Sequence, residues 1–144
     1  MNEKTNRGIL MTYIERCLYD YKANKALLEV LITEKESFMS MHGANYSLLD
    51  TNNVSDPVSE TAHRALELEK KIKNVEKQIN SVDRLYADLC GSAFYIHQMR
   101  EILRLKYFEH HDKSVIKEAL SISDATLWRR THELLRLAKK YFGE

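Results

Sequence analysis

Residues that break helices are scarce in this chain, which has one proline and four glycines among 144 residues. Leu, Ile, Lys and Glu recur instead at the three- and four-residue spacing of helices, so the sequence predicts an all-α fold. Cysteine is also rare, and Cys17 and Cys90 lack the Cys-x-x-Cys spacing of a redox pair or metal site. We expect both cysteines to be small buried hydrophobic residues.

An excess of one charge is missing as well, because 22 Lys and Arg residues face 21 Asp and Glu residues. Any affinity for nucleic acid must therefore come from where the charges lie and not from their sum. No apolar run approaches the length of a membrane span, and the polar N-terminus has no secretory signal. These absences predict a soluble protein in the cytoplasm, with no membrane partner.

The arrangements of residues that carry enzymatic chemistry are absent too. The chain has no Gly-rich phosphate loop, no metal-ligand spacing and no nucleophile beside a base. The neighbours His110 and His111 point to different sides of a helix, so we expect surface residues and not metal ligands. The sequence predicts that the protein is not an enzyme and has no cofactor, catalytic residue or metal site.

The N-terminal part begins with an apolar helix side between about residues 6 and 41. No proline or glycine forces a break there, so the segment is either one long helix or two helices with a kink near residues 21–24. Residues 42–55 read as a loop. Asp56 and Pro57 suit the first positions of the next helix, as cap and first residue.

That next helix, to about Leu89, repeats apolar residues every seven positions, in two series: Ala65, Ile72, Ile79 and Tyr86, and then Leu68, Val75, Val82 and Leu89. Such a repeat favours packing along one seam. In a parallel homodimer, Arg64–Glu69 and Lys71–Glu76 would attract across the interface. The seam can equally pack against the chain's own first segment as an antiparallel hairpin, and a larger bundle can use both.

We therefore predict that residues 1–90 form a long helical hairpin or coiled coil that serves oligomerisation or partner binding. A homodimer or a higher homo-oligomer is expected. In residues 92–144 ten basic residues face seven acidic ones, so the mild basic excess lies in the C-terminal part. Gly91 is expected to end the long helix in a left-handed conformation, and a further helix covers about residues 92–108.

The stretch that follows predicts a helix-turn-helix, within a DNA-binding domain of residues 91–144. Asp112 or Ser114 caps a short helix over 114–120, and Ser123 caps a second helix after a tight turn. The buried side of the short helix is expected to hold Val115, Ile116, Ala119 and Leu120.

In the second helix, a rotation of about 100° per residue divides the side chains between two sides. Leu127, Leu134 and Ala138, with Thr131 near them, share one side and are expected to be buried. The opposite side holds Ala125, Arg129, His132, Arg136 and Lys140. Arginine there can donate two hydrogen bonds to guanine or pair with phosphate, and alanine can touch a thymine methyl group. Arg130 lies closer to the buried side and can instead pair with an acidic neighbour.

Three other residue types complete the expected interface. Lysines on both helices are expected to position phosphates. Asp124 requires a cytosine amino partner or tunes specificity by repulsion, and Trp128 packs on the DNA backbone or at a partner interface. The expected DNA-binding residues are Lys113, Lys117, Asp124, Ala125, Thr126, Trp128, Arg129, His132, Arg136 and Lys140. The plainer alternative is a solvated basic side on an ordinary helix bundle.

Residues 116–127 resemble the helix-turn-helix of sigma-factor region 4. Ile116, Leu120, Ile122, Ser123, Thr126 and Leu127 match its pattern, I-A-x-x-L-G-I-S-x-x-T-V. Two positions depart from it, because Lys117 replaces a small alanine where the helices cross and Ser121 replaces the turn glycine. The lysine must direct its charge out of the crossing, and the serine must accept a conformation that is easier for glycine.

The wider layout resembles the RinA/ArpU-type activators of late transcription in phages of Gram-positive bacteria. The residues that carry this resemblance are Ser55-Asp56-Pro57, Leu105-Lys106-Tyr107-Phe108 and Ile122-Ser123-Asp124-x-Thr126. The resemblance implies a sequence-specific transcription activator of phage packaging and structural genes, which binds double-stranded DNA and acts with host RNA polymerase in the bacterial cell.

Two other functions fit the same helices. A small terminase subunit of a phage also joins a helix-turn-helix to further helices, but forms rings and usually carries the DNA-binding module first. A coiled-coil interaction protein would need no DNA at all.

Overall fold

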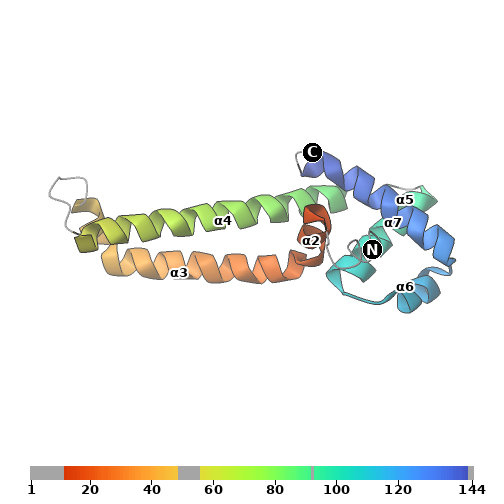
Figure 1. Cartoon of the computed structure of the whole chain (residues 1–144), viewed down its shortest axis with the longest axis horizontal. Coiled ribbons are helices and arrows are strands. Elements are labelled where there is room, and N and C mark those ends of the chain that lie inside the picture. The colour runs from red at the N-terminus through yellow and green to blue at the C-terminus, as the bar shows by residue number, and fades with distance from the viewer. Residues whose placement is uncertain (1–11, 49–55, 92, 143–144) are drawn as a thin grey trace, which may run out of the picture. The chain divides into compact units, whose positions relative to one another are not determined.

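The computed structural model describes residues 12–48, 56–91 and 93–142, with the backbone alone for residues 42–48 and 56–59. All regular structure in these residues is helical, which confirms the predicted all-α class (Figure 1). The chain divides into two compact units. One holds the described residues up to Ala23 and from Gln78 onwards, and the other is Asn24–Lys77.

The unit Asn24–Lys77 is built from parts of the two longest helices, α3 (Tyr21–Leu48) and α4 (Asp56–Asp88). The two helices lie side by side and run in opposite directions (Figure 1). Between them, Lys35 Nζ lies 3.4 Å from Glu69 Oε1, and Arg64 Nη2 lies 2.7 Å from Glu34 Oε2. Arg64 and Glu69, whose charges favoured a parallel homodimer, are therefore paired with α3 of the same chain.

The heptad seam of α4 is buried within the single chain. Seven of its positions are covered, while Tyr86 is half-buried: the covered residues are Ala65, Leu68, Ile72, Val75, Ile79, Val82 and Leu89. In α3, Leu31 is buried too. A seam already covered in this way is not available to a second copy, which would have to use another surface.

The first segment contains two helices and not one. Helix α2 (Tyr13–Tyr19) begins after Thr12, which forms a capping box with Glu15, and ends at Asp20. The break at Asp20 thus lies one residue before the expected kink region. Helix α3 starts directly afterwards, at Tyr21, and continues to Leu48. The predicted loop over residues 42–55 is thus wrong for its first part, because a helix tolerates Gly43 at a cost of about 1 kcal/mol. Residues 49–55 lie outside the described residues.

The other unit is a packed bundle of α2, the end of α4 and the C-terminal helices. The latter are α5 (Phe94–Ile102), the π-helix η1 (Leu103–Phe108), α6 (Lys113–Leu120), α7 (Asp124–Ala138) and the 3-10 turn η2 (Lys139–Tyr141). Its core contains Leu18, Ile102, Leu103, Tyr107 and Leu134, which have no exposed surface. The Tyr107 hydroxyl donates to Glu15 Oε2 over 3.2 Å. Packing thus groups α2 with the C-terminal helices, whereas the sequence placed residues 1–90 together.

Four expectations for single residues are wrong. Gly91 is not left-handed; a Cβ there would lie 3.1 Å from Ile96 Cδ1, so close packing favours glycine. Cys90 is exposed, with its sulfur 3.8 Å from Arg100 Nη1, although Cys17 is buried as expected.

Val115 and Ala119 are exposed because α6 buries only Ile116 fully and Leu120 in part.

No helix among the described residues is both long and apolar enough to cross a membrane.

Candidate nucleic-acid interface

Helices α6 and α7 are joined by a turn of three residues, Ser121–Ser123, and each has a side-chain cap. The Val115 amide donates to Asp112 Oδ1 over 3.0 Å at the start of α6. The Thr126 amide donates to Ser123 Oγ over 3.2 Å at the start of α7. The second bond confirms the predicted cap at Ser123, and the first shows that the cap of α6 is Asp112 and not Ser114. Each cap satisfies an amide that the first helical turn leaves unpaired.

The turn passes through Ser121 in a left-handed conformation, with φ 55° and ψ 50°. This is the position at which region 4 has glycine, and a side chain there costs about 1–2 kcal/mol. We expect Ser121→Gly to raise the free energy of unfolding by about 0.5–1 kcal/mol, as measured by chemical denaturation. Ser114→Gly, in the right-handed first turn of α6, is the control and should destabilise the protein. A loss of stability in Ser121→Gly would contradict the strain at this turn.

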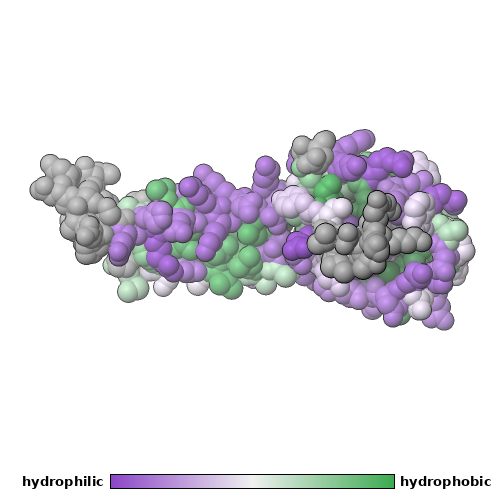
Figure 2. Space-filling view, in the orientation of Figure 1, coloured by the Kyte–Doolittle hydropathy of each residue, from purple (hydrophilic) through white to green (hydrophobic). Residues whose placement is uncertain are grey.

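The two sides of α7 are separated as the sequence predicted. Leu127, Leu134 and Ala138 are buried, and the buried Thr131 hydroxyl donates to the Leu127 carbonyl oxygen over 2.7 Å. The opposite side is exposed at Ala125, Arg129, His132 and Arg136. The part of α7 visible in Figure 2 is accordingly mostly hydrophilic. The core contacts therefore fix which side chains α7 presents outwards.

The arginines of α7 differ in how they are held. Arg130 donates to Gln98 Oε1 and to Glu133 Oε1, each over 2.9 Å, and its guanidinium lies over the Tyr95 ring. Within the described part of the chain, no hydrogen bond or ion pair holds Arg129 or Arg136. Arg130 thus anchors α7 to α5, whereas Arg129 and Arg136 have guanidinium groups available to an external anion or base.

Trp128 and His132 form an exposed aromatic pair one helical turn apart. Their ring centroids lie 3.8 Å apart, and 63% of the Trp128 surface is exposed. His132 Nδ1 lies 2.9 Å from the Trp128 carbonyl oxygen, which can only accept, so Nδ1 carries a proton. Neutral His132 then offers Nε2 as an acceptor, which suits the exocyclic amino group of a base.

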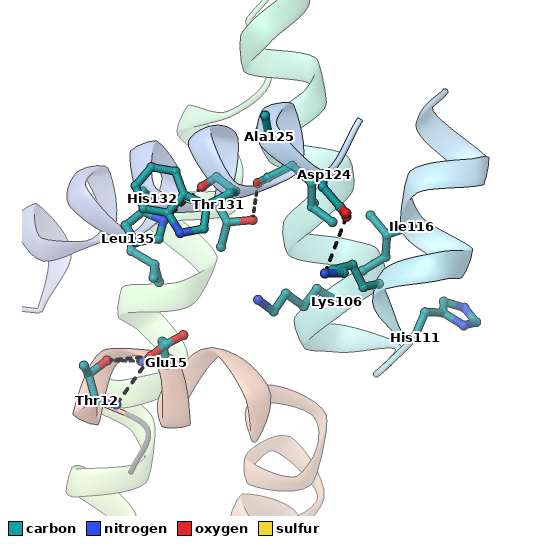
Figure 3. Close-up of a pocket in the computed structure, with 13 residues that line it drawn as sticks. Thr12, Glu15, Lys106, His111, Ile116, Asp124, Ala125, Thr131, His132 and Leu135 are labelled. Carbon is teal, nitrogen blue, oxygen red and sulfur yellow. Dashed lines mark hydrogen bonds and ion pairs between the residues drawn. The ribbon is translucent and has the colours of Figure 1, made fainter. Parts of the chain in front are cut away.

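Asp124 connects the two helices through ion pairs with lysines of α6. Its Oδ1 atom lies 2.9 Å from Lys117 Nζ and 3.5 Å from Lys113 Nζ. Lys117, at the position where the region 4 pattern has alanine, thus directs its charge towards the start of α7. Figure 3 shows Asp124 facing α6, and the dashed line from its carboxylate marks the ion pair with Lys113. The hydrogen bond from Lys117, followed by the charge of Lys113, holds the pKa of Asp124 below its ordinary value.

The pKa of Asp124 offers a direct check of this contact. A carboxyl group whose pKa is lowered in the folded state keeps its ion pairs above that pKa and loses them as the pH falls through it. NMR titration of the Asp124 carboxyl should give a pKa below the ordinary value, and Lys117→Gln should raise it. Lys140→Gln, which removes a charge outside this contact, should leave it unchanged. An ordinary pKa in the unmodified protein would show that the contact does not persist in solution.

The remaining predicted residues lie at the margins of this surface. Thr126 is half-buried, and its hydroxyl accepts from Ser123 Oγ over 3.1 Å, so its polar groups serve the cap. Lys140 is exposed on η2, beyond the end of α7.

A groove of about 910 Å³ borders the exposed side of α7 and includes residues that the sequence did not single out. Glu15 of α2 and Lys106 of η1 point into it from the side opposite α7 (Figure 3). Ile116, Leu127 and Leu135 contribute apolar walls. Burial lowers the pKa of Lys106 from its ordinary value. The helical spacing around Lys106 gave no sign of this, because the groove forms only when α2 packs near α7.

No group of three or more His, Cys, Asp or Glu residues in the described segments is arranged to hold a metal ion. Comparison of the chain with protein-family models, curated proteins and solved structures finds no significant match.

Proposed function

We propose that the protein is a sequence-specific DNA-binding transcriptional regulator in which α6, the turn and α7 act as a helix-turn-helix. The observation that carries this proposal is the arrangement of α7. Leu127 and Leu134 are buried in the core, while Arg129 and Arg136 are exposed and have no hydrogen bond or ion pair within the described residues. A capped helix with a buried apolar side and an exposed cationic side has the form that enters a DNA major groove.

In this proposal each exposed residue of α7 makes a different contact with DNA. Arg129 donates to the O6 and N7 atoms of a guanine, and Arg136 contacts a base or a phosphate. Ala125 meets a thymine methyl group, and His132 accepts from a base amino group. Lys140 lies on η2, just beyond the end of α7, and contacts the DNA backbone, where it contributes affinity but little sequence information.

The resemblance to RinA/ArpU-type activators extends the proposal to the biological target. The regulated genes would be phage late genes for packaging and structural proteins, transcribed by host RNA polymerase. A homodimer would read two half-sites about one helical turn apart. Figure 2 shows hydrophobic side chains on the surface of α3, where Leu27, Val30 and Ile32 are exposed, and this surface supports self-association.

Selection of binding sites from a random duplex pool tests the proposal with the full chain. We expect one enriched sequence, and competition by excess random DNA should remove less of it than of unselected duplex. Light scattering on the same sample gives the number of subunits and so distinguishes the proposed regulator from a small terminase subunit. A ring of many subunits that enriches only packaging-site DNA would favour a small terminase subunit. Failure to retain any duplex at low salt would favour an interaction protein and contradict DNA binding.

A further inference from the structure

Asp124 is the one acidic residue on the exposed start of the proposed recognition helix, and both of its neighbouring cations lie on α6. Lys117 Nζ and Lys113 Nζ lie 2.9 Å and 3.5 Å from the same oxygen, Oδ1. We propose that Asp124 determines DNA specificity by holding these two lysines away from backbone phosphates. Only in the cognate site does a base take their place as the partner of the Asp124 carboxylate, and the lysines are then released to the phosphates. This inference rests on the DNA-binding function proposed above.

The ion pairs of Asp124 with Lys113 and Lys117 hold the two lysines in the free protein, but they can be broken when DNA binds. The side chains of Asp124 and Lys113 are 62% and 67% exposed, and Lys117 is 32% exposed. Ion pairs in such exposed positions are screened by water and salt, so a competing anion can displace the carboxylate. A DNA phosphate is such an anion. The lysines therefore remain available to DNA, but only after Asp124 has been displaced.

The displaced carboxylate then meets different surroundings on different DNA. At the first position of α7, Asp124 lies where helices of this kind reach base edges. A cytosine in the cognate site offers its amino group, and a carboxylate can accept from it. A random duplex offers no such donor at a fixed position, and Asp124 then faces phosphates of its own charge. On random DNA, the free energy lost when the ion pairs of Asp124 break is not recovered. In the cognate site, the hydrogen bond from the cytosine amino group to Asp124 offsets that loss.

Asp124→Asn tests the inference with the full chain on two duplexes, one of random sequence and one carrying the selected site. On random duplex at low salt we expect roughly tenfold tighter binding, and a salt slope steeper by up to about 2, because two lysines now reach phosphates. On the selected site we expect a much smaller change, since the gain from the lysines is offset by a weaker base contact. The neutral amide oxygen of the variant accepts from the cytosine amino group less strongly than a carboxylate does. An unchanged affinity and slope on random duplex would overturn the inference.

Two further variants distinguish this contact from plain charge repulsion. Glu118→Gln removes the same charge from an exposed position of α6 and should change random binding much less. Adding Lys113→Gln and Lys117→Gln to Asp124→Asn should abolish the gain in affinity. A gain that persists without the two lysines would show that Asp124 merely repels DNA, and the inference would be wrong.

A comparison of single lysine variants remains informative even if Asp124→Asn folds poorly by circular dichroism. Because Lys113 is held by Asp124, Lys113→Gln should weaken binding to random duplex less than Lys140→Gln. Equal losses would overturn the inference. The proposed function fails separately, if the unmodified chain binds no duplex at low salt. If it binds a selected site but Asp124→Asn leaves random binding unchanged, only the inference fails.

Discussion

Arg129→Ala is expected to weaken binding to the selected DNA site by about 1–3 kcal/mol, which corresponds to about 5- to 150-fold. The reason is that Arg129 is exposed in the middle of α7, forms no hydrogen bond or ion pair within the described residues and lies on the helix side opposite Leu127 and Leu134. Truncation therefore removes contacts to DNA without removing contacts that hold the fold. Fluorescence anisotropy with a labelled duplex measures the affinity.

The comparison with random duplex decides what Arg129 does. A base-reading arginine should cost much less affinity on random DNA, where no guanine occupies the required position. Arg16→Ala, which removes an exposed arginine of α2, is the matched control and should change both affinities little. Equal losses on the two duplexes for Arg129→Ala would assign the residue to phosphate binding and contradict base reading.

Leu134→Ala is expected to lower the free energy of unfolding by about 2–5 kcal/mol, the largest stability effect predicted for α7. Leu134 has no exposed surface and lies in the core formed by α2, the end of α4, α5, η1, α6 and α7. Its truncation removes apolar contacts and leaves a cavity that the packed helices fill only in part. The same variant should lose affinity for DNA, since α7 would no longer be held in one orientation.

Denaturation followed by tryptophan fluorescence suits this experiment, because Trp128 is the only tryptophan and lies on α7. The signal therefore reports the unit that contains the proposed interface, even if the unit Asn24–Lys77 unfolds separately. Val115→Ala is the control, and it should cost less than about 1 kcal/mol because Val115 is 42% exposed. A Leu134→Ala protein as stable as the original would contradict the role of the leucines in fixing α7.

Features set by neighbouring residues could be predicted from the sequence. The buried side of α7, its cap at Ser123 and the heptad seam of α4 all follow from short spacings, which depend on helix geometry alone. A conformation that suits glycine was also expected at Ser121, but from the resemblance to region 4 and not from spacing, and its φ of 55° agrees with that. These local features include the exposed arginines on which the proposed interface depends.

Features set by contacts between distant residues could not be predicted in the same way. Nothing in the spacing of α2 indicated that Tyr107 would bond to Glu15, or that the groove beside α7 would include Glu15 and Lys106. The break at Asp20 also lacks a helix-breaking residue. The pairing of Asp124 with Lys113 and Lys117 could have been predicted in part, because two lysines four residues apart lie on the same side of α6. It was missed because the lysines were assigned to phosphate binding.

The choice between the two packings of the α4 seam shows a third kind of limit. Arg64 and Glu69 suit a partner helix in a second copy, and they also suit Glu34 and Lys35 of the same chain. The sequence contains both possibilities with similar charges, so only the three-dimensional arrangement distinguishes them. The homodimer that we propose would therefore have to use other residues, such as the exposed apolar side chains of α3.

The central claim is that the exposed side of α7 is the surface that meets duplex DNA. An amide NMR titration of the full chain with the selected duplex tests it most directly, because each residue reports its own surroundings. We predict that the largest shifts fall in α7, at Ala125, Arg129, His132 and Arg136, and in α6. Large shifts confined to α3 and α4, with α7 unchanged on saturation, would contradict the account.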